Sequence, residues 1–161
     1  MKSIVDNAIA RRRQGDFEGC RALLYPLLTG ADAALAHLHI AWSFDNQGQE
    51  LNAAEHYRQA LTGDLSPQDR FEAQFGLAST LRCLGQYQAA LPLFEALLQD
   101  FPEALEVQPF YAICLYNLGR HKEALALMLK LTVAISRHDG INAYGRAISL
   151  YAEDLDLIQR R

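Results

Sequence analysis

Four glycines recur along the chain at nearly equal intervals, and this spacing restricts the possible folds more than any other feature. They are Gly15, Gly48, Gly85 and Gly119, and they are separated by 33, 37 and 34 residues. A period of this length is typical of structural repeats that stack on one another. Glycine adopts left-handed backbone geometry at little steric cost, so we expect each of the four to form a tight turn between two helices.

Other residues recur in register with these glycines. A small residue stands seven positions before and five positions after each glycine, and a large apolar residue stands nine positions after it. The three columns are Ala8, Ala41, Ala78 and Ala112; Cys20, Ala53, Ala90 and Ala124; and Leu24, Tyr57, Phe94 and Met128. Spacings of three, four and seven place residues on one helical face. The pattern therefore predicts paired helices that approach closely at the small residues.

The pattern is most complete in residues 71–102, FEAQFGLASTLRCLGQYQAALPLFEALLQDFP. Here the chain resembles the tetratricopeptide repeat proteins, whose unit of about 34 residues is a helix–turn–helix with this arrangement of small residues. The resemblance extends over nearly the whole chain. The sequence is also similar to that of small bacterial members of the family, some of which are thought to form dimers. It implies an all-α fold, an α-α superhelix or solenoid in a single domain over residues 1–161. The expected repeats are 1–32, 34–65, 71–102 and 105–136, followed by a capping helix over 140–158.

Helical periodicity predicts nine helices. Their ranges are 2–14, 17–29, 32–47, 50–62, 67–84, 87–99, 103–118, 121–137 and 140–158. We expect Ser66 to cap the fifth helix, with Pro67 in its first turn. Pro26 and Pro92 lie inside the second and sixth helices, where a proline removes a backbone hydrogen bond and should bend the helix.

Composition argues against nucleic acid and membranes as partners. Half of the residues are hydrophobic, while the formal net charge is -4 and the pI is about 5.7. A mildly acidic protein has no general attraction to nucleic acid or to anionic membranes. No apolar stretch reaches the roughly 20 residues that a membrane-spanning helix needs, and the N-terminus does not resemble a signal peptide. We therefore expect a cytoplasmic protein.

No pattern of catalytic or metal-binding residues occurs. The chain has no phosphate-binding glycine loop, no HExxH motif and no CxxC motif. Cys20, Cys83 and Cys114 are odd in number and widely spaced, which indicates buried, reduced thiols. His37 and His39 are two residues apart, so they face different sides of a helix and cannot bind one metal ion together. We therefore expect no cofactor and no metal, and we predict that the protein is not an enzyme.

The family resemblance implies a binding groove, because the first helix of each pair lines the concave side in these proteins. The candidate partner-binding residues lie six, three or two positions before the glycines and are Arg12, Arg13, Trp42, Asp45, Asn46, Ser79, Arg82, Ile113, Tyr116 and Asn117. Tryptophan, tyrosine and arginine commonly dominate the energetics of interfaces. Trp42 is the leading candidate, and the alternative is that it packs on the neighbouring repeat.

Arg12, Arg13 and Arg82 could receive an acidic peptide or a carboxylate terminus, and a solvated charged face explains these charges at least as well. Some family members hold a C-terminal carboxylate with a clamp of lysines and asparagines. This chain lacks that clamp, because the equivalent columns contain Val5, Ile9, His39, Glu72 and Gly76. The sequence therefore disfavours binding of the C-terminal tail of a chaperone through such a clamp.

The last predicted helix has no successor in the repeat array. Tyr144, Ile148 and Tyr151 follow helical spacing within it. The helix is expected to act as a plain cap over the open end of the array, and the alternative is a seam between two copies in a homodimer.

Taken together, these features predict a protein–protein interaction module. It would bind a partner protein or peptide in the groove, with self-association as an additional role. A chaperone for a secreted or assembly protein is the alternative function, and a small-ligand sensor or an enzyme is less favoured.

Overall fold

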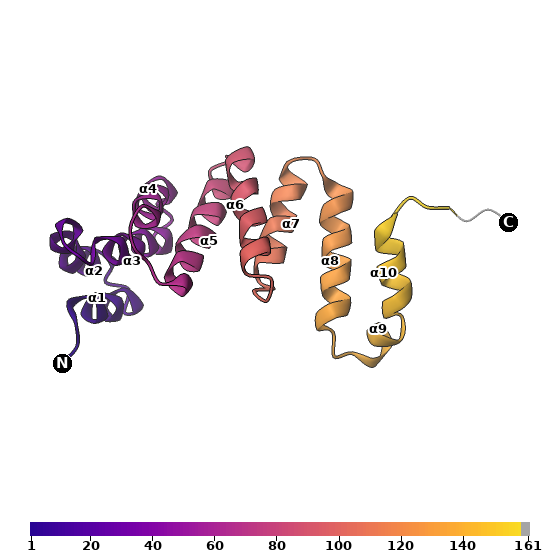
Figure 1. The fold of residues 1–161 in the computed structure, drawn as a ribbon, viewed down its shortest axis with the longest axis horizontal. Helices are drawn as coiled ribbons and strands as arrows, with labels where there is room; N and C mark the ends of the chain where they lie inside the picture. The colour runs from indigo at the N-terminus through magenta and orange to yellow at the C-terminus, as the bar shows by residue number, and fades with distance from the viewer. Residues whose placement is uncertain (159–161) are drawn as a thin grey trace. The chain divides into compact units, whose positions relative to one another are not determined.

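The computed structural model of the protein describes residues 1–158, and within that range every regular element is a helix. The elements are α1 (Ile4–Arg13), α2 (Phe17–Leu24), a 3-10 helix η1 (Tyr25–Thr29), α3 (Ala33–Asn46), α4 (Glu50–Leu61), α5 (Pro67–Cys83), α6 (Tyr87–Asp100), α7 (Val107–Asn117), α8 (His121–Ile135), α9 (Asp139–Ala143) and α10 (Gly145–Glu153) (Figure 1). Consecutive helices form pairs joined by short turns. The all-α prediction and the predicted helix–turn–helix units are confirmed.

The four repeat glycines form the turns inside these pairs. Gly15, Gly48, Gly85 and Gly119 have φ values of 83°, 70°, 76° and 80°, and within residues 1–158 they alone have positive φ. A side chain at such a position would be strained, since L-residues rarely adopt left-handed geometry. The regular glycine spacing therefore sets the lengths of the helices on either side.

The small-residue columns lie in the interior, as the repeat pattern predicts. Ala8, Ala41 and Ala78 have no exposed surface, and neither do Cys20, Ala53 and Ala90. The corresponding alanines of the fourth repeat, Ala112 and Ala124, are also buried. Paired helices come close together at these positions because no larger side chain holds them apart.

Three sequence-based expectations about local structure need correction. The helix predicted over residues 17–29 changes to 3-10 geometry at Tyr25, where Pro26 cannot donate the next α-helical hydrogen bond. The helix predicted over 140–158 is two short helices, α9 and α10, which meet at Tyr144. Cys83 is exposed, whereas Cys20 and Cys114 are buried as expected. By contrast, α6 continues as a helix through Pro92.

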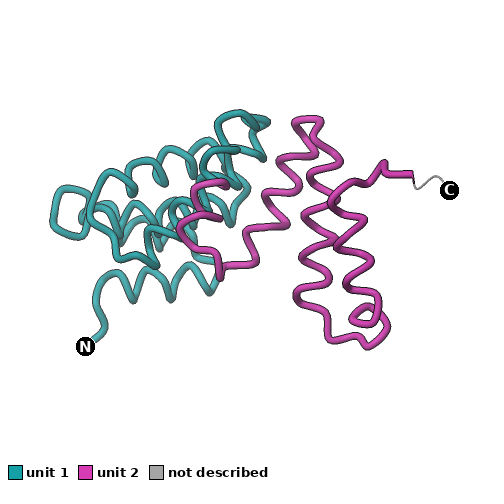
Figure 2. The backbone as a smooth tube through the Cα atoms, turned by 45° about the vertical axis from the view of Figure 1, so that its right-hand side comes forward, with its two compact units in different colours: residues 1–93 teal, residues 94–161 magenta. Residues whose placement is uncertain are grey.

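The chain divides into two compact units, residues 1–93 and residues 94–161 (Figure 2). In the first unit α2 packs against α3, α3 against α4, and α4 against α5. Its innermost cluster joins α1, α2 and α3 through Val5, Ala8, Cys20, Leu24, Ala36 and Ile40. Ser66 caps α5 by accepting a hydrogen bond from the Asp69 amide, and Pro67 follows in the first turn, so both predictions for this helix start are confirmed. The expectation of a single domain stays a prediction.

In the second unit α8 lies between α7 and α10 and packs against both (Figure 1). The contact with α10 is close, because a Cβ added at Gly145 would lie 3.1 Å from the Val133 side chain. Two ion pairs also join these helices and their extensions: Lys130 with Glu153, at 2.8 Å, and Lys122 with Asp156. The last helix therefore covers one side of α8 and leaves the other side facing α7.

Candidate functional site

Trp42 lies on α3 between two side chains that the sequence does not place beside it. The Arg12 guanidinium of α1 is 5.0 Å from the centre of the Trp42 ring, and the His39 ring is 5.6 Å from it. Arg12 Nη1 also donates a hydrogen bond to Asn46 Oδ1, at 3.2 Å. Three predicted groove residues, Arg12, Trp42 and Asn46, are thus brought together by the first helices of two repeats. Trp42 is half-buried, so it packs on the neighbouring repeat and also presents part of its ring to solvent.

His39 is a functional candidate that sequence reasoning missed. The side chain is buried beneath Trp42, and its Nδ1 atom has no hydrogen-bond partner. Burial lowers the pKa of His39 to about 4, and the nearby Arg12 charge lowers the same pKa further. The imidazole is therefore neutral at physiological pH. The position of His39 in the repeat could be read from the sequence, because His39 lies two residues before Ala41, a member of the small-residue column.

Asp45 lies among the predicted groove residues, and its carboxylate is engaged inside the first unit. The Tyr57 hydroxyl of α4 donates to Asp45 Oδ2 at 2.5 Å, and the Thr80 hydroxyl of α5 donates to Asp45 Oδ1 at 3.3 Å. Burial raises the pKa of Asp45, and the two hydrogen bonds act in the opposite direction. The carboxylate therefore ties three helices together, and its part in partner binding stays a prediction.

The other predicted residues of the first unit lie on two helices. Arg13 is exposed on α1, whereas Ser79 and Arg82 are half-buried on α5. Arg82 Nη2 lies 3.8 Å from the Cys83 sulfur atom. Arg13 is thus available to solvent, while Ser79 and Arg82 present only part of their surface.

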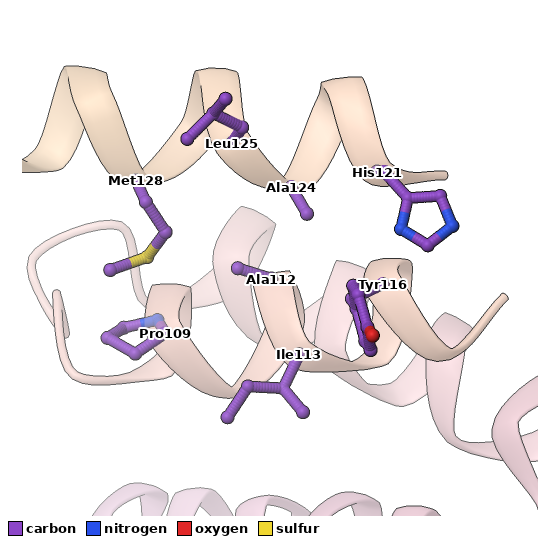
Figure 3. Close-up of a pocket in the computed structure, with 8 residues that line it drawn as sticks. All are labelled: Pro109, Ala112, Ile113, Tyr116, His121, Ala124, Leu125 and Met128. Carbon is purple, nitrogen blue, oxygen red and sulfur yellow. The ribbon is translucent and has the colours of Figure 1, made fainter. Parts of the chain in front are cut away.

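The second unit contains an apolar hollow of about 380 Å³ between α7 and α8, which we call the α7/α8 groove. It is lined by Pro109, Ala112, Ile113, Tyr116, His121, Ala124, Leu125 and Met128 (Figure 3). Two predicted groove residues, Ile113 and Tyr116, belong to this lining and are exposed. The Tyr116 ring meets the His121 ring edge-on, with centroids 4.8 Å apart. Asn117 follows on α7 and is half-buried.

The residues that α8 contributes to this groove could not be recognised from the sequence as binding residues. Leu125 and Met128 fall in columns that a repeat normally buries, and the residue equivalent to Leu125 in the second repeat, Ala54, is 2% exposed. Leu125 itself is 53% exposed. The two residues differ in exposure because different helices cover the two repeats. The sequence does not reveal which helix covers which repeat.

The three residues of the predicted dimer seam lie at or on α10. Tyr144 and Tyr151 are exposed, and Ile148 is half-buried. Gly145 and Ala152 form the side of α10 that is buried in the second unit. The two tyrosines, seven residues apart, therefore lie on one accessible face of the capping helix.

Residues 1–158 contain neither a cluster of metal ligands nor a membrane-spanning helix. In that range no three histidine, cysteine, aspartate or glutamate side chains come close enough to hold a metal ion together. His37 pairs with His56 of α4, and the two Nδ1 atoms are 2.9 Å apart. The spacing of His37 and His39 along the sequence could not reveal this contact between two helices. None of the helices in the described part of the chain has the length and apolar character to cross a membrane.

Comparison with known proteins agrees with this architecture. The family described as tetratrico peptide repeat matches residues 33–155. The crystal structure of MamA superposes with a TM-score of 0.71 at 17% identity, over 95% of this chain and 90% of that chain. The structure of a MamA mutant superposes with a TM-score of 0.64 at 19% identity, over 94% and 85% of the two chains. No curated protein matches the sequence. At these identities the structural similarity establishes the fold alone.

Proposed function

The chain belongs to the tetratricopeptide repeat family, and from this premise we propose that it is an interaction module whose α7/α8 groove binds a helix of another protein chain. The observation that carries the proposal is the exposed apolar lining of the groove, with Ile113, Tyr116 and Leu125 open to solvent. Contiguous apolar surface of this kind commonly marks a site of protein association.

A helix suits the groove better than an extended peptide. The groove runs between two packed helices and has no exposed strand edge to which an extended peptide could add. Amphipathic helices bind such grooves by inserting apolar side chains spaced three, four and seven residues apart. Tyr116 and His121 at one end add polar atoms that would orient the incoming helix.

A second contact surface in the first unit is favoured by the arrangement around Trp42. Arg12 lies over the half-buried indole of Trp42, and Arg13 is exposed nearby on α1, so this surface is positively charged and partly aromatic. Such a surface complements an acidic segment of a partner protein.

The protein would work in the cytoplasm without a cofactor and without catalysing a reaction. A chaperone for a secreted or assembly protein is a special form of this function, since a chaperone also holds apolar segments of its client.

Affinity purification from the native host, followed by mass spectrometry, tests the proposal. Leu125→Glu places a charge in the groove and should abolish capture of the partner. Leu51→Glu is the matched control, because Leu51 is 72% exposed on α4 and lies outside the groove. Trp42→Ala tests the second surface. The helical circular dichroism signal should be the same in all variants, and retention of every partner by both Leu125→Glu and Trp42→Ala would show the proposal to be wrong.

A further inference from the structure

We propose that His37 and His56 together form a binding site for one divalent transition metal ion, with Cu²⁺ and Ni²⁺ as the preferred ions. His37 lies on α3 and His56 on α4, the two helices of the second repeat, and their Nδ1 atoms are 2.9 Å apart. The bound ion bridges the two helices. The site shares no residue with the surface around Trp42 or with the α7/α8 groove.

The distance between the two nitrogen atoms suits a metal ion. A bond from a metal to an imidazole nitrogen is about 2.0–2.1 Å long, so one ion can contact two nitrogens 2.9 Å apart with an angle of about 90° between the bonds. Neighbouring ligands form this angle in square-planar and octahedral coordination, whereas a tetrahedral ion with the same bonds would hold the nitrogens roughly 3.3–3.4 Å apart. Tetragonal sites with nitrogen ligands are typical of Cu²⁺ and Ni²⁺.

The pair of histidines is particular to the second repeat. His37 lies eleven positions before Gly48, and His56 lies eight positions after it. The equivalent pairs in the other repeats are Ile4 with Leu23, Gln74 with Leu93, and Gln108 with Leu127. In the third repeat these positions also face each other, since Gln74 Nε2 donates a hydrogen bond to the Leu93 backbone carbonyl at 3.3 Å. The repeat register therefore brings the two positions together, and the second repeat places a metal ligand at both.

Packing holds the His56 ring in place before any ion binds. The ring stacks on the Phe44 ring, with the two centroids 5.6 Å apart and an angle of 22° between the planes. The Arg21 guanidinium lies 4.2 Å from the centre of the Phe44 ring and donates a hydrogen bond to the Ser43 hydroxyl at 3.0 Å. A ligand side chain that is already ordered loses little conformational freedom on binding, which favours metal affinity.

Access and nearby charge also favour a cation at this site. Both histidines are half-buried, so the ion can enter from solvent and water molecules can complete its coordination. The negative charge of Glu55 favours a positive charge at both imidazole rings. The positive charge of Arg21 opposes it at His56, but its effect there is smaller than that of Glu55.

The protonation of the two rings is compatible with metal binding. Burial lowers the pKa of His37 and of His56, so both imidazoles are neutral at pH 7, and the neutral ring is the form that binds metals. Without a metal, one Nδ1–H donates to the other Nδ1. When the ion binds, the donor ring exchanges its Nδ1 proton for one on Nε2 through water, so that both Nδ1 lone pairs face the ion. No net proton is released.

Two protein ligands indicate an exchangeable ion and not a resident one. Catalytic zinc sites commonly have three protein ligands and structural zinc sites four. Within residues 1–158 no third histidine, cysteine, aspartate or glutamate lies close enough to join the pair. An exchangeable ion that links α3 to α4 stabilises the second repeat more strongly as the metal concentration rises.

Isothermal titration calorimetry of the full chain with Ni²⁺ tests the proposal. Ni²⁺ is a better probe than Cu²⁺, because Cu²⁺ oxidises thiols and Cys83 is exposed. His37→Gln and His56→Leu introduce residues that other repeats carry at these positions, so the hairpin should still fold. Each variant should bind Ni²⁺ at least about tenfold more weakly than the wild type. His39→Gln is the matched control on the same helix, because His39 is buried beneath Trp42, and it should keep the wild-type affinity.

Thermal unfolding gives a second readout that requires the ion to bridge the helices. Saturating Ni²⁺ should raise the unfolding midpoint of the wild type and of His39→Gln, but not that of His37→Gln or His56→Leu. Circular dichroism without metal checks that each variant is folded. A wild type that binds no Ni²⁺ up to about 1 mM overturns the proposal. Equal affinities of the wild type and His56→Leu also overturn it, because the ion would then bind elsewhere on the chain.

Discussion

The Arg12 guanidinium on α1 lies 5.0 Å from the centre of the Trp42 ring on α3, and the same guanidinium donates a hydrogen bond to Asn46 at 3.2 Å. The pair joins the first helices of two successive repeats at a solvent-facing surface. A cation held over an aromatic face is stabilised by the quadrupole of the ring. The contact that builds this surface therefore also stabilises the first unit.

A double-mutant cycle of Arg12→Ala and Trp42→Ala should reveal this coupling. We expect an interaction energy of about 0.5–1 kcal/mol in urea unfolding, the usual value for a partly exposed cation–π pair. Arg13→Ala combined with Trp42→Ala is the control, because Arg13 is exposed on the same helix. Equal coupling for both arginines would contradict the specific role of Arg12.

Tyr57→Phe should destabilise the protein by about 1–3 kcal/mol, the cost of leaving a buried acceptor with too few donors. The substitution removes the hydroxyl that donates to Asp45 at 2.5 Å and leaves Thr80 as the remaining side-chain donor to this carboxylate. Thermal unfolding measures the effect. Tyr25→Phe, at an exposed tyrosine, should change the midpoint of thermal unfolding little. An equally small change for Tyr57→Phe would show that the hydrogen bonds of Asp45 do not stabilise the contact between the helices.

Stability should fall as the pH is lowered from about 6.5 towards 4. The pKa of His39 is about 4 in the folded protein, below its ordinary value of 6.5, so the unfolded chain binds more protons in this window. Stability is therefore present above pH 6.5 and is lost as the pH falls towards 4. Burial also lowers the pKa values of His37 and His56, which adds to the effect in the same direction.

The contribution of His39 can be isolated with His39→Gln. This variant should show a shallower decline of unfolding free energy between pH 6.5 and pH 4, and the difference should not exceed about 3 kcal/mol. Parallel pH profiles for the wild type and His39→Gln would disprove the assignment.

Ala90→Leu should cost about 1–3 kcal/mol through overpacking. Ala90 has no exposed surface on α6, so the three added carbon atoms must displace their neighbours. The adjacent Ala89 is exposed on the same helix, and Ala89→Leu should leave the thermal midpoint nearly unchanged. A tolerated leucine at position 90 would show that the small-residue column does not control helix packing.

Gly85→Ala should cost about 1–2 kcal/mol, because the residue has a φ of 76°. A Cβ at this position would meet no atom within 4 Å, so the cost comes from backbone conformation and not from crowding. Gly30→Ala is the control, since Gly30 has a φ of −118°, which any residue adopts. Equal stabilities of the two variants would argue against conformational strain at the turn.

Much of the fold could be predicted from the sequence because the repeat is encoded locally. Left-handed turns require Gly15, Gly48, Gly85 and Gly119, and close helix crossings require Ala8, Ala41 and Ala78. Both requirements follow from backbone and side-chain size within a single repeat. The start of α5 was predictable for the same reason, because Ser66 and Pro67 act on neighbouring amides.

The site was less predictable, because it depends on which surfaces other helices cover. Trp42, Arg12, Ile113 and Tyr116 could be proposed from their register. The structure places the first two on a surface of the first compact unit and the other two on a surface of the second. The buried His39 and the exposed Leu125 were not foreseen. Their environments depend on residues from other helices.

The sequence by itself determined the helical hairpins, their turns and the small residues at their crossings, since these depend on interactions between residues close in the chain. Only the tertiary structure decided that Asp45 binds Thr80, 35 positions away, and that the terminal segment breaks at Tyr144. It also decided that α10 packs on α8 and leaves the α7/α8 groove open. The physical reason is that burial depends on distant neighbours, so equivalent repeat positions become core in one repeat and surface in another.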